Sequence, residues 1–155
     1  MDEKTMERIA LSVLSKIDSV KNVRNFMIAD LEKTIALKDT PKGAPNFMLA
    51  LALCAYTEYW GRFIEGKVHG DSEVCFKAFF KKLGKCYEEL LNRSELNIYH
   101  DVRCGLAHAY MIERNSTIYV RKGTCGVEYD SSKKAYTFNV MTYFENFKQA
   151  VDQYI

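Results

Sequence analysis

The amino-acid sequence predicts a mainly α-helical protein: an up-down bundle of four to five helices with a small antiparallel β hairpin inserted before the C-terminal helix. Two observations lead to this prediction. Apolar residues recur at helical spacing as far as Glu113, with short connections between the helical stretches. After Glu113 the pattern changes to short alternating segments. A chain of 155 residues is expected to form one domain, residues 1–155, with the β insertion at about 116–140.

Four helical stretches are predicted before the insertion. The first spans about 9–35, as one helix or as two that meet near residues 18–19. The second runs from Asn46 to about Ile64 and is apolar nearly all round, which is typical of a central buried helix. The third runs from residue 71 or 72, where an aspartate or a serine can serve as N-cap, to about 92. The fourth begins at 94–95.

The β insertion is predicted from three segments, 117–121, 126–129 and 135–140, which are rich in β-branched and aromatic residues. Residues 130–134 are expected to form the turn between the last two. A final helix begins at about Thr142 and closes the bundle.

Composition narrows the functional classes. Lys plus Arg is 22 and Asp plus Glu is 20, so the chain lacks the large basic excess of proteins that bind nucleic acid by bulk phosphate attraction. Any contact with RNA is expected to be local. The five cysteines are scattered without metal-ligand spacing, which predicts reduced thiols, a cytoplasmic location and no metal site or cofactor. The longest apolar run, 47–56, is too short for a membrane span.

Polar groups that can take part in catalysis gather in residues 101–110. Arg103 and Tyr110 are seven apart and share a face of an ideal helix. His108 lies about 140° from Arg103 at ~100° per residue, on the side of Asp101. Arg103 and His108 therefore meet only if Gly105 loosens the helix or if a second subunit completes the cleft.

These side chains are sufficient for metal-free RNA cleavage. Histidine transfers protons near neutral pH, and arginine holds a phosphate through paired hydrogen bonds. His108 would move a proton while Arg103 stabilises the charge on the phosphoryl oxygens, with Tyr110, Asp101 and Glu58 in supporting roles. The alternative is structural: a solvated arginine and a hydrogen-bonded histidine that close the bundle. His100 is expected to pack, with assistance to Arg103 as the other option.

The segment from Arg103 to Tyr110 resembles the signature of the HEPN superfamily, an arginine followed by four to six residues and a histidine on a bundle of four or five helices. Its His-x-Tyr ending is similar to the toxin half of HEPN/nucleotidyltransferase toxin–antitoxin pairs. The resemblance implies that Arg103 and His108 are ribonuclease residues at a homodimer interface, and that Tyr110 can be modified by a partner antitoxin. Active members commonly have a polar residue where this chain has Cys104.

Two functions follow as expectations. The first is a dimeric, metal-independent HEPN-type endoribonuclease that acts as a toxin or defence component. The second is a catalytically silent HEPN-like module that binds a nucleotide, RNA or a protein, which the Cys104 substitution and the weak basic balance favour.

Overall fold

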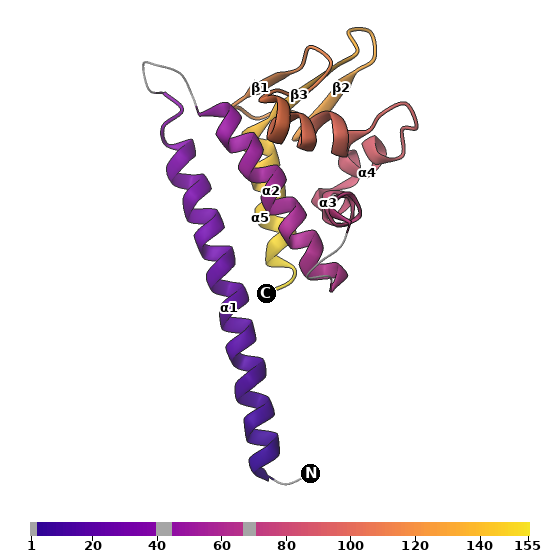
Figure 1. Cartoon of the computed structure of the whole chain (residues 1–155). Helices are drawn as coiled ribbons and strands as arrows, with labels where there is room; N and C mark the ends of the chain where they lie inside the picture. The colour runs from indigo at the N-terminus through magenta and orange to yellow at the C-terminus, as the bar shows by residue number, and fades with distance from the viewer. Residues whose placement is uncertain (1–2, 40–44, 67–70) are drawn as a thin grey trace.

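The computed structural model describes residues 3–39, 45–66 and 71–155, and it confirms a mainly helical chain with a small three-stranded sheet (Figure 1). The elements are, in chain order, α1 (Glu3–Ile35), α2 (Asn46–Glu65), α3 (Ser72–Phe80), the short 3₁₀ helix η1 (Lys81–Leu83), α4 (Lys85–Leu91), the π-helix η2 (Tyr99–Ala109), β1 (Thr117–Tyr119), β2 (Val127–Asp130), β3 (Ala135–Asn139) and α5 (Val140–Asp152).

Helix α2 lies at the centre of the molecule, as its apolar sequence predicts. Leu53, Cys54 and Trp60 are fully buried. The helix packs very closely against α3 at Gly61, where an added Cβ would lie 1.7 Å from the carbonyl oxygen of Cys75. Only glycine permits this approach of two backbones, so residue 61 sets the distance between α2 and the helix that follows it.

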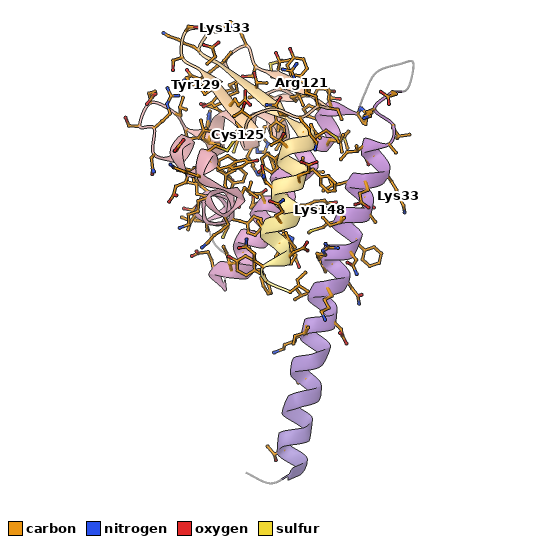
Figure 2. All side chains as sticks on the ribbon, turned by 180° about the vertical axis from the view of Figure 1, so that it is seen from behind. Lys33, Arg121, Cys125, Tyr129, Lys133 and Lys148 are labelled. Atoms are coloured by element: carbon orange, nitrogen blue, oxygen red, sulfur yellow. A yellow bond between two sulfur atoms is a disulfide. The ribbon has the colours of Figure 1, made fainter. Side chains whose placement is uncertain are left out.

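Helix α1 is one continuous helix, without a break at residues 18–19. Figure 1 shows that its N-terminal half projects beyond the rest of the molecule, while its C-terminal half packs on the core through Met27, Ile28 and Leu31. Two ion pairs join α1 to α5: Arg24 with Asp152 at 2.7 Å, and Glu32 with Lys148 at 3.2 Å (Lys148 is labelled in Figure 2). With 33 residues, α1 is thus much longer than the part of it that packs on the core.

The third predicted helix is interrupted. Asp71 is its N-cap, as expected, and its carboxylate accepts hydrogen bonds from the backbone amides of Glu73 and Val74. The prediction of one helix to residue 92 is wrong, because Gly84 adopts a φ of 141° that α-helical backbone does not allow. The chain turns there, and α4 starts in a new direction.

The sheet is mixed rather than purely antiparallel, which corrects the predicted topology. The strand order is β1-β3-β2, and β1 pairs with β3 in parallel. The predicted hairpin is present between β2 and β3, with Tyr129 opposite Tyr136 and the turn at residues 131–134. Strand β3 is central because Tyr136 and Phe138 both bury their rings against the helices. The final helix follows it directly, at Val140.

Two of the five cysteines are joined, so the prediction of five reduced thiols is wrong. A disulfide links Cys86 on α4 to Cys125, the latter just before β2, with a Cα–Cα distance of 6.3 Å (Cys125 is labelled in Figure 2). The cytoplasmic location loses the support of reduced thiols and stays a prediction. Within the ranges given above, no helix combines the length and the apolar character that a membrane crossing requires.

Candidate functional site

The Arg103–Tyr110 motif lies on η2, which is a π-helix throughout. The fourth helix thus starts at Tyr99 instead of at 94–95. Backbone hydrogen bonds in a π-helix join residues five apart, and the amide of Tyr110 donates in this way to the carbonyl of Gly105. Arg103 and His108 are also five apart. Because a π-helix has more residues per turn than an α-helix, they lie closer to one face than the ~140° of an ideal α-helix.

The chain folds back on η2 directly after the motif, and Gly105 makes this fold possible. Tyr110 has a φ of 57°, in the left-handed region, which ends the helix. The chain then returns past Gly105, whose carbonyl also accepts a hydrogen bond from the amide of Met111 at 3.3 Å. A Cβ at residue 105 would lie 2.6 Å from the carbonyl oxygen of Met111. Gly105 therefore allows a close backbone approach in addition to loosening the helix.

Arg103 points from η2 to α2 and is held by Glu58. Its Nε donates a 2.8 Å hydrogen bond to Oε2 of Glu58, and its side chain is 22% exposed. Its guanidinium lies 5.9 Å from the ring centre of Tyr99. Within the described residues, Nε is the only nitrogen of the Arg103 side chain that makes a hydrogen bond. The two terminal nitrogens remain as donors for an anion.

Glu58 is the centre of a charged cluster that joins α2, α3 and η2. Its Oε1 accepts a 2.8 Å hydrogen bond from Arg62, which in turn donates to the hydroxyl of Ser72. Burial acts to raise the pKa of Glu58, but hydrogen bonds from Arg62 and Ser72 and the charge of Arg103 outweigh it and lower the pKa. The carboxylate is therefore ionised at neutral pH and fixes the direction of Arg103.

His108 and Tyr110 lie at the exposed C-terminal end of η2, where Tyr110 is the C-cap, so the expected helix face shared by Arg103 and Tyr110 does not form. Tyr110 is 71% exposed, and its ring contacts Phe47 at the start of α2 in a tilted arrangement, with 3.6 Å between ring centres and 33° between the ring planes. The two rings line one wall of a cavity of about 290 Å³ that extends to β1 at Ile118. An open aromatic surface that begins two residues after His108 in the sequence can stack on a nucleobase. Cys104, between Arg103 and Gly105, is half-buried.

Asp101 does not join Arg103, although sequence reasoning grouped them. Its carboxylate is turned towards the sheet, where Oδ2 accepts a 2.7 Å hydrogen bond from the hydroxyl of Tyr136 on β3 and lies 3.1 Å from Nε of Arg114. Burial, together with this hydrogen bond, raises the pKa of Tyr136. Asp101 thus anchors η2 to the sheet, while Glu58 anchors it to α2.

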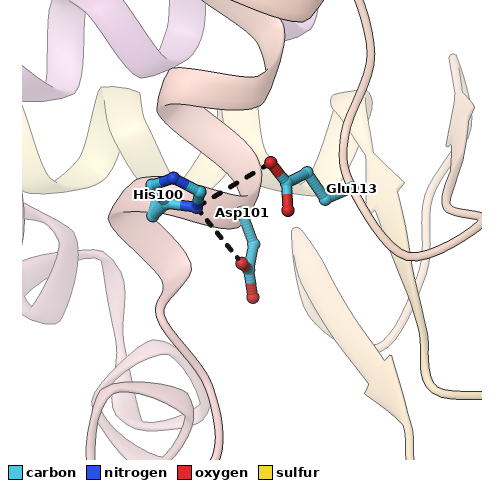
Figure 3. A group of neighbouring side chains, drawn as sticks. All are labelled: His100, Asp101 and Glu113. Atoms are coloured by element: carbon cyan, nitrogen blue, oxygen red, sulfur yellow. Dashed lines mark ion pairs between the residues drawn. The ribbon is translucent and has the colours of Figure 1, made fainter.

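A second group of polar side chains, which sequence reasoning missed, lies at the start of η2. Each of His100, Asp101 and Glu113 offers one atom that can bind a metal ion, a ring nitrogen or a carboxylate oxygen, and these atoms all lie within 4.8 Å of one another (Figure 3). The imidazole of His100 is 62% exposed, so its expected packing role is wrong. Glu113 reaches this position only because the chain reverses after Tyr110. Sequence spacing gives no signal for that reversal.

The motif and its surroundings were compared with known proteins. No protein-family model matches the chain, and neither the curated proteins nor the solved structures contain a match. The motif and the geometry of η2 are therefore the features from which a function can be inferred.

Proposed function

We propose that the protein is a metal-independent endoribonuclease of the HEPN type, with Arg103 and His108 as its catalytic residues. The single observation behind the proposal is the π-helical turn that contains both residues. This turn removes most of the angular separation that an α-helix would impose between them. Regular π-helical turns are rare and occur frequently at functional sites.

The proposed reaction is an internal transfer within RNA. The 2′-hydroxyl oxygen attacks the adjacent phosphorus, and His108 accepts the proton from that hydroxyl. The bond from phosphorus to the 5′-oxygen breaks, and the leaving oxygen takes a proton from water. The products are a 2′,3′-cyclic phosphate and a 5′-hydroxyl. The terminal nitrogens of Arg103 bind the phosphoryl oxygens, where negative charge develops in the transition state.

Two further residues support this chemistry. Glu58 is a positioning residue, because its hydrogen bond to Nε orients the guanidinium of Arg103 and leaves the two terminal nitrogens to face the phosphate. Tyr110 and its neighbour Phe47 form the surface on which a base next to the cleaved bond stacks. Asp101 supports the site only by holding η2 against the sheet.

The resemblance of the motif also underlies the proposed assembly. A homodimer packed along η2 would bring a second Arg103 and His108 to the same cleft. In a toxin–antitoxin setting, the partner would be an antitoxin that covers the exposed Tyr110. A cytoplasmic location belongs to this proposal, since the substrate is cellular RNA.

One observation favours the second function, a silent HEPN-like module that binds RNA, a nucleotide or a protein. The carboxylate of Glu58 already offsets the charge of Arg103, which weakens its ability to stabilise a transition state. The same pair still permits hydrogen bonding to a bound phosphate. Binding without cleavage is the outcome that would select this function.

The test is cleavage of a mixed-sequence RNA by the purified chain, with and without EDTA. We expect cyclic-phosphate ends in both conditions and a loss of about 10²–10⁴-fold in rate for His108→Ala, the range of general acid–base catalysis. Arg103→Ala should lose a similar factor. Arg121→Ala is the matched control, since Arg121 is an exposed arginine outside η2, with its guanidinium 3.8 Å from the ring centre of Tyr119. Cleavage that survives both motif substitutions contradicts the proposal.

A further inference from the structure

We propose that His100, Asp101 and Glu113 form a binding site for a divalent cation of the Zn²⁺ type. The site is separate from the Arg103–His108 pair and does not depend on the nuclease proposal. One histidine and two carboxylates supply one nitrogen and two oxygen ligands. A three-ligand set of this kind leaves at least one coordination position open for water or a further ligand.

The three side chains converge on one gap (Figure 3). Nδ1 of His100 lies 3.7 Å from Oδ1 of Asp101 and 3.8 Å from Oε1 of Glu113. Both distances are too long for hydrogen bonds. Two ligands of a tetrahedral Zn²⁺ lie about 3.4 Å apart, because each bond to the metal is about 2.1 Å; the three ligand atoms here lie within 4.8 Å of one another. The observed spacing therefore fits an ion in the gap with a small movement of the exposed Glu113.

Asp101 presents one oxygen of its carboxylate to the gap while its neighbours hold the other. Its side chain is only 5% exposed, and both neighbours that hold it, Tyr136 and Arg114, contact Oδ2. Oδ1 receives no hydrogen bond from any residue in the described ranges and faces His100. Metal-binding carboxylates are commonly oriented in this way, with one oxygen held by surrounding donors and the other on the metal.

The charge and the donor types select the class of ion. Asp101 and Glu113 contribute two negative charges, and Arg114 offsets one of them. One negative charge remains to attract a cation. An imidazole nitrogen suits Zn²⁺ and its transition-metal neighbours, whereas Mg²⁺ and Ca²⁺ prefer oxygen ligands throughout.

A bound ion would join the two ends of the motif segment. His100 and Asp101 lie in the first turn of η2, and Glu113 follows the chain reversal. The amide of Glu113 already donates a 3.0 Å hydrogen bond to the carbonyl of Asp101. The cation would add a second link at this point, and so would hold the start of η2 against the segment that closes it.

The experiment is calorimetric titration of the metal-free full chain with Zn²⁺, followed by Co²⁺ absorption spectroscopy as a report on ligand geometry. We expect one equivalent of Zn²⁺ and a rise in melting temperature on binding. His100→Ala and Glu113→Gln should each weaken the affinity at least tenfold and remove that rise. The two side chains are 62% and 46% exposed, so neither substitution opens a cavity in the core.

The matched control is the double variant Cys104→Ser with His108→Ala, which removes a thiol and an imidazole that can also bind Zn²⁺. This variant should keep the wild-type affinity. No binding to the wild type would overturn the proposal, as would wild-type affinity in both His100→Ala and Glu113→Gln, or loss of binding in the control. The readouts are independent of RNA cleavage, so failure of the nuclease proposal leaves them interpretable.

Discussion

Replacing Glu58 with glutamine is the sharpest test of how the molecule holds its motif. The change keeps the size and the hydrogen-bonding oxygen of the side chain but removes the charge that Arg62 and Arg103 share. The Glu58 side chain is 9% exposed, and the two arginines are 28% and 22% exposed. Removal of one partner from a buried ion pair costs about 3–5 kcal/mol, and an exposed pair contributes about 0–1 kcal/mol.

The Glu58 cluster lies between these limits, because the carboxylate is buried but both guanidinium groups reach water. We expect Glu58→Gln to lower the free energy of unfolding by about 2–3 kcal/mol at pH 7, measured by urea denaturation. The control is Glu73→Gln. Glu73 also pairs with a cation four residues later, Lys77, but both side chains are about 40% exposed. Its loss should cost less than about 1 kcal/mol.

The pH dependence gives a second and independent test. The pKa of Glu58 is lowered in the folded protein from its ordinary value of 4.5. Its contribution to stability is therefore complete above about pH 4.5 and is lost as the pH falls through the folded pKa. The difference between the wild type and Glu58→Gln, which cannot titrate, should narrow below about pH 4.5. Equal losses for the two glutamine variants, or a difference that is constant down to pH 3, would refute the reasoning.

Two other predictions concern Gly105 of η2 and the disulfide between Cys86 and Cys125. Gly105→Ala should lower the free energy of unfolding by about 1–3 kcal/mol, because the added Cβ would lie 2.6 Å from the carbonyl oxygen of Met111. Thermal unfolding measures this loss. An unchanged melting temperature would contradict the close approach of the two backbones. Reduction of the Cys86–Cys125 disulfide, which spans 39 residues, should lower stability by about 3–4 kcal/mol through the entropy of the unfolded chain. Urea denaturation of the wild type with and without reductant tests this. The Cys86→Ala/Cys125→Ala variant should match the reduced protein. Equal denaturation curves with and without reductant would argue against the disulfide.

Local patterns predicted most of the helical content because each depends on neighbours in sequence. The apolar residues of α2 marked it as the central helix, and the Asp71 N-cap marked the start of α3. The β2–β3 hairpin followed from its turn residues at 131–134. The interruption at Gly84 was missed, because an isolated glycine within a helical pattern is usually tolerated and only the φ of 141° shows that this one is not.

Contacts between distant segments could not be predicted in the same way. The parallel pairing of β1 with β3 depends on which strand edge is free after the hairpin forms. The disulfide joins cysteines 39 residues apart, and their scattered spacing gave no sign of it. Glu58 was expected to support the site or to pair with a cation, but its contact with Arg103 could not be derived from spacing, since Glu58 lies 45 residues earlier and reaches it through the packing of η2 on α2.

The sequence by itself determined that Arg103 and His108 lie on one helix, and that an α-helical turn would separate them; it also predicted Tyr110 on that helix, but Tyr110 is the residue that ends it. The tertiary structure decided the helix type: η2 is a π-helix, in which residues five apart lie closer to one face than in an α-helix. Contacts on both sides hold η2, with Glu58 on α2 and Tyr136 on β3, and the chain reversal at Tyr110 packs against Gly105. The π-helical turn forms where these contacts meet, and its hydrogen bonds alone do not favour it over an α-helix. Spacing along the chain therefore identified the motif, and long-range packing set its geometry.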